Sequence, residues 1–170
     1  MDDEAITNEL PLNDETIKLA LGELESGGCI WAETTYRIAF DVGKRLMGYS
    51  RAFVVPDELC ETSVTIAYAT IFSFPMLLIE DDEWFMLGDE YSGDLLDATT
   101  QLKELRDLES EKFDDDVSCQ QRAIVIERFR VMEPFQKRGY GKKCAHKMLL
   151  SAGAAGSMVM MIPGRIGEDK

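Results

Sequence analysis

The sequence is poor in the residues and patterns that mark several common protein classes. Its 170 residues include one histidine, and its four cysteines form no C-x-x-C pair, so neither a zinc site nor a disulfide framework is expected. The longest nearly uninterrupted apolar stretch, 71–79, is about half of a membrane span. The amino terminus is acidic where a secretory signal needs a basic start and an apolar run. These absences predict a cytoplasmic protein without a transmembrane helix.

Basic residues are also scarce, and they are unevenly distributed. The chain has 18 Lys and Arg against 32 Asp and Glu, a formal net charge of −14. Its surface as a whole should therefore repel nucleic acid and anionic lipid, while a basic protein partner stays open. Residues 1–120 hold 28 acids and 8 bases, a net −20, whereas residues 121–170 hold 4 acids and 10 bases, a net +6. The second segment is therefore expected to meet an anion.

Size and periodicity predict one domain that begins with a helix. Apolar residues make up 45% of the sequence, enough for a single domain spanning 1–170. Asn13 is a good N-cap, and the helical spacing behind it ends at Gly27-Gly28, so residues 1–30 are interpreted as an N-terminal helical segment. The alternation over 32–47 favours a strand, although a helix also fits these residues.

The middle of the chain combines strand-like and helical patterns. Period-two spacing predicts a strand over 63–72, and two apolar runs on either side of an acidic turn predict a β-hairpin over 76–87. Helical spacing returns over 93–112. The acidic triplet 114–116 then breaks the pattern and is interpreted as a solvated loop.

The last part of the chain is predicted to form a β-loop-α-β unit over 121–163. A strand is expected over 121–132, a helix over 139–152 with Cys144 on its buried face, and a buried strand over 158–162. The single histidine falls on the polar side of this helix and is expected to be solvated.

The segment 136–141, Gln-Lys-Arg-Gly-Tyr-Gly, lies between that strand and that helix. Its two glycines let the backbone approach a ligand closely, and the first helical turn offers unpaired N–H groups at the positive end of the helix dipole. Its own Lys and Arg, with Lys142 and Lys143, add positive charge. The segment therefore predicts a phosphate or diphosphate site, with a plain glycine turn among solvated lysines as the structural alternative. The third glycine of a dinucleotide fingerprint and the G-K-S/T ending of a P-loop are both absent.

This segment resembles the cofactor motif Q/R-x-x-G-x-G/A of the GNAT superfamily of acyl-CoA-dependent N-acyltransferases, and Phe129 and Val131 fall at the apolar strand positions of the longer family pattern. The resemblance covers residues 122–162. It implies a fold of the α+β class, an α/β sandwich with a mixed central sheet flanked by helices, in which the hairpin 76–87 corresponds to the second and third strands. The order of elements over 63–112 is also loosely similar to small acidic acetyltransferase-like proteins of tailed phages.

The resemblance implies that acetyl-CoA, or another acyl-CoA, is the cofactor. The backbone amides of Arg138 to Lys142 would bind its pyrophosphate, and the strand end at Phe129 to Val131 would line its pantetheine arm and thioester. The implied cofactor-binding residues are Phe129, Arg130, Val131, Gln136, Lys137, Arg138, Gly139, Tyr140, Gly141 and Lys142.

Attack of an amine on a thioester requires that the amine lose a proton. The glutamate that some family members carry on the strand before the motif would fall at Val125, which is not an acid. Glu127 lies two residues further on the same strand face and is the candidate base. A salt bridge of Glu127 with Arg128 or Arg130 is the structural alternative.

The family's C-terminal wall is expected to be missing. Residues 164–170 leave no room for its last helix, with the tyrosine that protonates the leaving thiolate, or for its last two strands. The amino-terminal half or a second subunit, as in a homodimer, would supply this wall, or the protein binds a CoA-like ligand without efficient turnover.

Two functions are consistent with these observations. The first is acyl transfer from acetyl-CoA to an amine of a small molecule or a protein. The second is a degenerate acyltransferase fold acting as an acidic protein-binding module that inhibits or redirects a cellular enzyme; the missing wall and the −20 charge of residues 1–120 motivate it.

Overall fold

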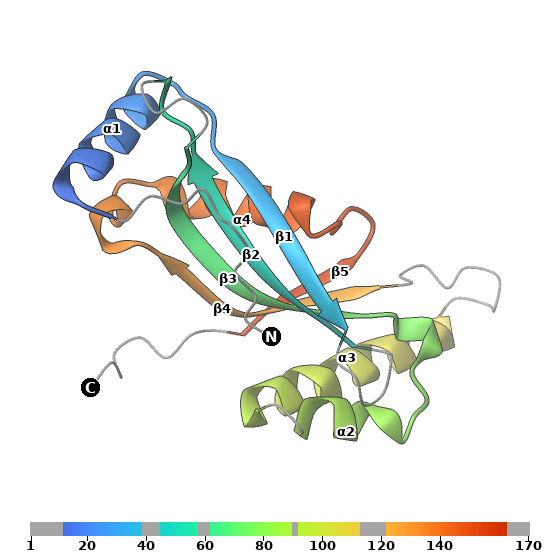
Figure 1. Ribbon diagram of the computed structural model, residues 1–170. Helices are drawn as coiled ribbons and strands as arrows, with labels where there is room; N and C mark the ends of the chain where they lie inside the picture. Colours follow the sequence, from blue (N-terminus) through green and yellow to red (C-terminus); the bar gives the residue numbers. More distant parts are fainter. Residues whose placement is uncertain (1–11, 39–44, 58–61, 90–91, 113–121, 163–170) are drawn as a thin grey trace.

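The computed structural model describes residues 12–38, 45–57, 62–89, 92–112 and 122–162 (Figure 1). Its helices and strands are α1 (Asp14–Glu25), β1 (Trp31–Ile38), β2 (Leu46–Val54), β3 (Val64–Phe74), α2 (Glu83–Asp89), α3 (Gly93–Lys112), β4 (Ala123–Val131), α4 (Tyr140–Ser151) and β5 (Met158–Met161). Single 3₁₀ turns lie at Met76–Leu78 and Glu133–Phe135. No helix in these ranges is long and apolar enough to cross a membrane.

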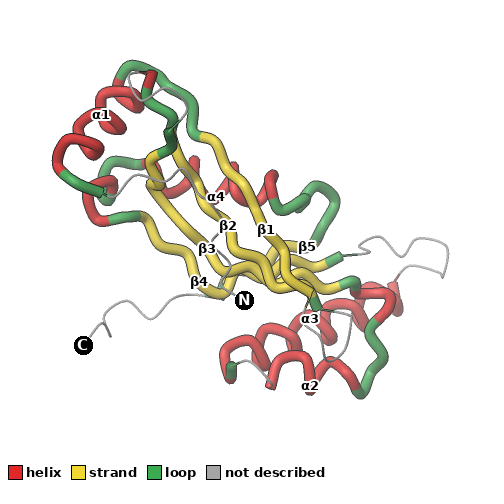
Figure 2. The backbone as a smooth tube through the Cα atoms, viewed as in Figure 1, coloured by secondary structure: helices red, strands yellow, loops and turns green. Residues whose placement is uncertain are grey.

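The strands form one mixed sheet in the order β1-β2-β3-β4-β5. Strands β1 to β4 pair antiparallel with their neighbours, and β5 pairs parallel with β4. A parallel pair needs a crossover connection, which α4 supplies. With helices on both faces, the fold is of the α+β class and compatible with an α/β sandwich (Figure 2).

The sheet separates two hydrophobic cores. The first core lies between the sheet and helices α1 and α4, and its largest fully buried members are Ile66, Ile71, Ile124, Ile126, Phe135 and Met148. The second core lies between the sheet and the pair α2–α3, which covers one end of the sheet (Figure 1), and its largest fully buried members are Phe72, Phe74, Trp84, Leu87, Leu95 and Leu102. Nearly every residue of β3 is buried, because this central strand contributes to both cores.

Several sequence predictions are confirmed. Asn13 caps α1: its side chain accepts hydrogen bonds from the N–H groups of Glu15 and Thr16, at 3.1 and 2.9 Å, and the Asn13 N–H donates to the Thr16 hydroxyl oxygen at 3.1 Å. Helices α3 and α4 and the β4-loop-α4-β5 unit are present as expected. The triplet 114–116 lies outside the described residues.

Within 32–47, residues 32–38 and 46–47 are strand and belong to two strands, and residues 39–44 lie outside the described ranges. Strand β1 ends at Ile38, and β2 begins at Leu46. The sequence did not predict β2 because glycine, serine and arginine alternate with its apolar residues and weaken the pattern. Strand β1 has the expected alternation, with exposed residues separated by half-buried ones.

The predicted hairpin over 76–87 is wrong. Met76–Leu78 is a 3₁₀ turn, and the second run lies in helix α2. Trp84 and Leu87 are buried while the two residues between them are exposed, which is a helical spacing. The acidic turn begins this helix, because Glu83 accepts a hydrogen bond from the N–H of Glu80 at 2.7 Å. Periodicity in such short apolar runs cannot separate strand from helix.

The strand expected over 158–162 is present but not buried. It lies at the edge of the sheet, and Val159 and Met161 are 43% and 49% exposed. Its other face, which includes Met158 and Met160, packs against the second core. An uninterrupted apolar run is typical of a strand that is buried on both faces, whereas only one face of this strand is covered.

Substitutions in α2 test its helical assignment. Trp84 is 1% exposed and lies under the Arg106 guanidinium at 5.4 Å, whereas Phe85 is 60% exposed. Trp84→Ala should lower the free energy of unfolding by about 3–5 kcal/mol, because it leaves a cavity in the second core. Phe85→Ala should change it by less than about 0.5 kcal/mol. Urea denaturation of both variants measures this difference, and equal losses would contradict the assignment.

Candidate functional site

The loop between β4 and α4 has a backbone suited to an anion. Phe135 is fully buried and anchors the loop in the first core. Lys137 and Gly139 have positive φ, 58° and 81°. Gly139 is the N-cap of α4, and no side chain caps the first helical turn. The amides of that turn therefore keep their capacity to bind a ligand.

Side-chain contacts connect this loop to the end of β4. Gln136 donates a hydrogen bond from Nε2 to the carbonyl oxygen of Val131 at 2.9 Å. Gly141 lies against the same strand end, where a Cβ would meet Val131 Cγ2 at 3.6 Å and Phe129 Cε1 at 4.0 Å. The start of α4 thus packs directly on the two apolar positions that the sequence singled out.

Positive charge surrounds the start of α4. Lys137, Arg138, Lys142 and Lys143 are exposed, and Arg138 Nη1 lies 3.6 Å from Glu25 Oε1 on α1. These exposed cations raise the local concentration of anions without a large pairing energy.

The other two candidate groups on α4 lie where the sequence predicted. His146 is exposed and lines a hollow of about 220 Å³ between α4 and the segment that follows α1. Cys144 is fully buried, and desolvation raises the pKa of its thiol to about 11. The thiol therefore stays protonated at neutral pH and is not a nucleophile.

Strand β4 continues past its pairing with β5. The pairing covers Ala123 to Ile126, and the N–H of Ile162 donates to the Ile126 carbonyl at 2.9 Å. From Glu127 to Val131, β3 lies on one side of β4, and no described strand pairs with β4 on the other. We call this stretch the free edge.

The backbone groups of two residues point toward the free edge. Met132 donates its N–H to the carbonyl of Ile66 on β3 at 2.8 Å. Successive residues of a strand alternate in the direction of their backbone groups. Those of Phe129 and Val131 therefore point away from β3, and the Val131 carbonyl is the one that Gln136 holds.

Glu127 occupies a β-bulge. In the β3–β4 register Ile71 faces Ile126 and Thr70 faces Arg128, so Glu127 is the extra residue. Its carboxyl stays on the side of the second core, where it bonds to Ser92 just before α3. Beyond the bulge the alternation is reversed, so Phe129 and Val131 pack on the first core.

The Glu127 carboxyl is buried and incompletely bonded. The residue is 8% exposed, and its Oε2 has no hydrogen-bond partner among the described residues. Desolvation raises its pKa above the ordinary value of 4.5, and Asp94 adds to the rise. Arg128 and the bond from Ser92 act in the opposite direction.

The structure brings together most, but not all, of the residues expected in the cofactor site. Phe129, Val131 and the loop 136–142 lie together on the α4 side of the sheet. Arg130 is exposed and, by strand alternation, lies on the other face. Glu127 also lies on that other side, so a ligand in the loop reaches it only past the free edge.

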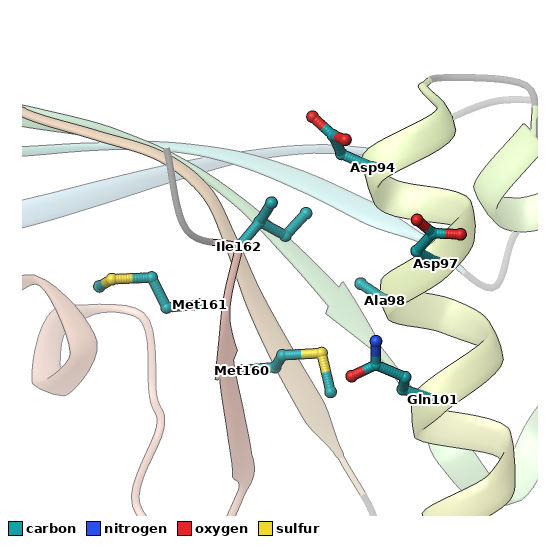
Figure 3. A pocket seen from close by; sticks show the side chains of 7 residues that line it. All are labelled: Asp94, Asp97, Ala98, Gln101, Met160, Met161 and Ile162. Carbon is teal, nitrogen blue, oxygen red and sulfur yellow. The ribbon is translucent and has the colours of Figure 1, made fainter. Parts of the chain in front are cut away.

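Sequence reasoning missed a second group of residues beside Glu127. Asp94, Asp97 and Gln101 of α3 form one wall of a hollow of about 270 Å³, opposite Met160 and Ile162 at the end of β5 (Figure 3). Their spacing of three and four residues places them on one helix face, which was a usable signal. It was missed because the facing strand was expected to be buried.

The two glycines of the loop should respond differently to alanine. Gly139→Ala should lower the free energy of unfolding by about 1 kcal/mol, because an L side chain is strained at its φ of 81°. Gly141→Ala meets only ordinary contacts in a helix and should change stability by less than about 0.5 kcal/mol. Urea titration of both variants is the measurement. A larger loss for Gly141→Ala would contradict the loop geometry.

Comparisons with protein-family models, with curated proteins and with solved structures find no match for this chain. Within the described residues, no group of three or more His, Cys, Asp and Glu could hold a metal ion. The function of the protein is therefore inferred from the glycine loop, the free edge and Glu127.

Proposed function

We propose that the protein is a cytoplasmic acyltransferase that binds acetyl-CoA, or another acyl-CoA, and transfers the acyl group to an amine, in the manner of the GNAT superfamily. The observation that carries this proposal is the succession along one strand of a buried carboxyl at Glu127, the free edge, and the glycine loop that opens α4. The loop, the free edge and the Glu127 carboxyl would then meet, in that order, the pyrophosphate, the arm and the thioester of a bound acyl-CoA.

The loop would bind the pyrophosphate. The uncapped first turn of α4 offers N–H groups, and the exposed cations Lys137, Arg138 and Lys142 add charge to an otherwise acidic molecule. The free edge would take the arm that links pyrophosphate to thioester. That arm contains amides, and an extended amide chain can hydrogen-bond to a strand edge as an added strand does.

The length of the free edge fits this arrangement. Four residue steps from Glu127 to Val131 span about 13 Å at about 3.3 Å per residue. The thioester would therefore arrive at the bulge, beyond the last described pair of β4 and β5. The acid and the acyl group then meet although the loop and Glu127 lie on opposite sides of the sheet.

Glu127 would act as the general base. The ammonium group of the acceptor gives one proton to the Glu127 carboxylate, and the neutral nitrogen attacks the thioester carbonyl carbon. A C–N bond forms, the C–S bond breaks, and the second proton of the attacking nitrogen passes to the departing CoA thiolate, which leaves a neutral amide, a free thiol and the first proton on Glu127. A raised pKa suits this role, because it brings the base closer to neutral pH.

Protein binding is a second candidate function. Tyr49 and Tyr68 are 50% and 42% exposed on neighbouring strands and line a hollow of about 410 Å³ on the sheet. Exposed aromatic side chains of this kind are common in protein interfaces. Because the predicted hairpin is replaced by helices, the resemblance to acyltransferases is weaker in this half of the chain. Absence of acetyl-CoA binding by the folded protein would favour this candidate.

Titration calorimetry with acetyl-CoA tests the cofactor. The full chain should bind it, and Lys142→Gln should raise the dissociation constant by about three- to tenfold at low salt, because one cation beside the pyrophosphate is lost. Lys18→Gln removes the same charge from the exposed face of α1 and should have no effect. No binding at millimolar acetyl-CoA would overturn the proposal.

Glu127→Gln should lower the rate of acyl transfer without lowering the stability of the protein at neutral pH. Loss of the base should reduce acyl transfer about a hundredfold or more. The carboxyl binds its proton more tightly in the folded than in the unfolded protein, so its contribution to stability falls as the pH rises from its ordinary pKa through the raised one. Above that window the Gln variant should therefore be more stable, by about 1 kcal/mol.

Thermal denaturation across this pH range, together with a thiol-release assay, measures both effects. Glu80→Gln is the matched control, because Glu80 is exposed in the turn before α2. A Gln variant that keeps full activity would exclude Glu127 as the base.

A further inference from the structure

One face of the sheet is only partly covered by helices. The pair α2–α3 packs on one end of this face (Figure 1), and strand alternation places exposed and half-buried side chains on the same side beyond it. We call this stretch the open face, and it lies on the opposite side of the sheet from α4. Its members are Trp31, Glu33, Thr35 and Arg37 of β1, Tyr49, Arg51 and Phe53 of β2, Tyr68 and Thr70 of β3, and Arg128 and Arg130 of β4.

The charge of the open face is opposite to that of the molecule. Four of the nine arginines in the sequence lie on it, against one acid, Glu33, so the open face carries +3 where the whole chain carries −14. Glu33 is already paired, because Arg51 Nε donates to its carboxylate at 2.5 Å. At physiological salt, exposed charges more than about 8 Å apart are largely screened, so a ligand here responds mainly to the nearby arginines. The open face therefore attracts an anion.

Flat side chains lie between these arginines. Tyr49 and Tyr68 are exposed and line the hollow of about 410 Å³, together with Thr35 and Thr70. The strand register arranges the open face in two rows that cross the sheet, Glu33, Arg51, Tyr68 and Arg130 in one row and Thr35, Tyr49, Thr70 and Arg128 in the next. Each row contains one tyrosine and ends in an exposed arginine on β4. The two rows therefore repeat the same pair of groups, a ring and a cation, about 6.6 Å apart.

A ligand that matches both rows repeats a flat ring and a negative charge in each of its units. Single-stranded nucleic acid has this composition, because its bases stack on aromatic side chains and its phosphates pair with arginine. Bases stacked in a duplex are about 3.4 Å apart, whereas the rows are about 6.6 Å apart. The spacing therefore fits the splayed bases of a single strand rather than a stacked duplex.

The kind of contact that the open face offers also favours nucleic acid over an extended peptide. Such peptides add to a sheet by hydrogen bonds with an edge strand, whereas β2 and β3 lie between other strands and use their backbone groups within the sheet. All four cations are arginine, whose planar guanidinium binds phosphate through two hydrogen bonds and also stacks on rings. Such stacking is already present: Arg51 lies over the Phe53 ring at 4.7 Å, and Arg37 over the Tyr49 ring at 5.9 Å.

We propose that the open face is a binding site for single-stranded RNA. Two consecutive bases stack on Tyr68 and Tyr49, and the phosphates beside them pair with Arg130 and Arg128. The hydroxyl groups of Thr35 and Thr70, which line the hollow, bond to the ribose 2′-hydroxyl that DNA lacks. This site goes beyond the acyltransferase function proposed above and does not depend on it, because the glycine loop lies on the other side of the sheet.

Fluorescence anisotropy of a labelled oligouridylate of about ten nucleotides, titrated with the full chain, tests the stacking contacts. The oligouridylate should bind at about 0.1 M salt. Tyr68→Leu should weaken binding about tenfold, because leucine keeps apolar surface at this position but cannot stack on a base. Phe85→Leu removes an exposed aromatic ring from α2, away from the open face, and should have no effect. Thermal denaturation verifies that each variant is folded, and Tyr49→Leu provides a second position should Tyr68→Leu prove unstable.

The salt dependence of the same titration measures the phosphate contacts. For a single strand, each phosphate that pairs with a cation contributes about −0.7 to the slope of log K against log salt concentration. Arg130→Gln should therefore make this slope less steep by about 0.7 and weaken binding about three- to tenfold. Lys142→Gln removes the same charge from the start of α4, on the other side of the sheet, and should leave the slope and the affinity nearly unchanged.

Several outcomes would overturn the proposal. The first is no binding of oligouridylate at about 0.1 mM folded protein, and the second is binding that neither Tyr68→Leu nor Arg130→Gln weakens. A deoxyuridine strand of the same length should bind several-fold more weakly, and equal affinity would contradict the assignment to RNA. Polyglutamate that binds more tightly than oligouridylate, and that Tyr68→Leu weakens, would show that the ligand is an acidic protein.

Acetyl-CoA binding, measured on the same variants, separates this proposal from the acyltransferase function. Tyr68→Leu should weaken RNA binding and leave acetyl-CoA binding unchanged, whereas Lys142→Gln should do the reverse. RNA binding without acetyl-CoA binding would remove the acyltransferase and leave the RNA site in place. Acetyl-CoA binding without RNA binding would remove the RNA site alone.

Discussion

One extra residue in β4 determines which side chains of this strand face the first core and which face the second. Glu127 has no partner on β3, so the alternation of side chains along β4 is reversed after it. The first half of β4 follows the ordinary pattern between the two cores, and the second half turns Phe129 and Val131 toward α4. Without this residue, those two side chains would lie on the other face, and α4 could not begin where it does.

The same residue places a carboxyl between two environments. The second core and the start of α3 bury it, and beyond the end of the β5 pairing no described strand pairs with the stretch of β4 beside it. Contacts elsewhere hold this arrangement in place. Tyr36 of β1 donates a hydrogen bond to the Ala152 carbonyl at the end of α4, at 2.8 Å, and the Arg122 guanidinium lies over the Tyr36 ring. Helix α4 is therefore fixed at both ends relative to β4.

The features that could be predicted from the sequence are those that neighbouring residues determine. Asn13 caps α1 through contacts within three residues, and the glycines around Tyr140 begin α4 through local backbone freedom. The predicted hairpin over 76–87 is wrong because Trp84 and Leu87 are buried in the second core, against residues of β3 and α3 that lie outside these short apolar runs. The bulge at Glu127 depends on the pairing of its neighbours with Thr70 and Ile71, more than fifty residues earlier in the chain.

The candidate site divides in the same way. The glycine loop is a continuous segment, and its composition alone indicated an anion. The hollow between α3 and β5 is lined by residues of both elements, so it exists only once the sheet has formed. The position of Glu127 on the strand predicted it as the candidate base. Its burial depends on the second core, and its contact with Ser92 depends on α3, and neither can be predicted from the strand. Sites that are built from residues of distant segments could not be predicted from the sequence.

The position of α3 and α4 on opposite faces of the sheet has a kinetic consequence. The loop of α4 lies on the side of the first core, and the hollow beside α3 lies on the side of the second. In the proposed acyltransferase, a cofactor bound at the loop would therefore leave the hollow uncovered. Two ligands that bind on separate faces need no obligatory order of addition, and the proposed transfer would pass through a ternary complex.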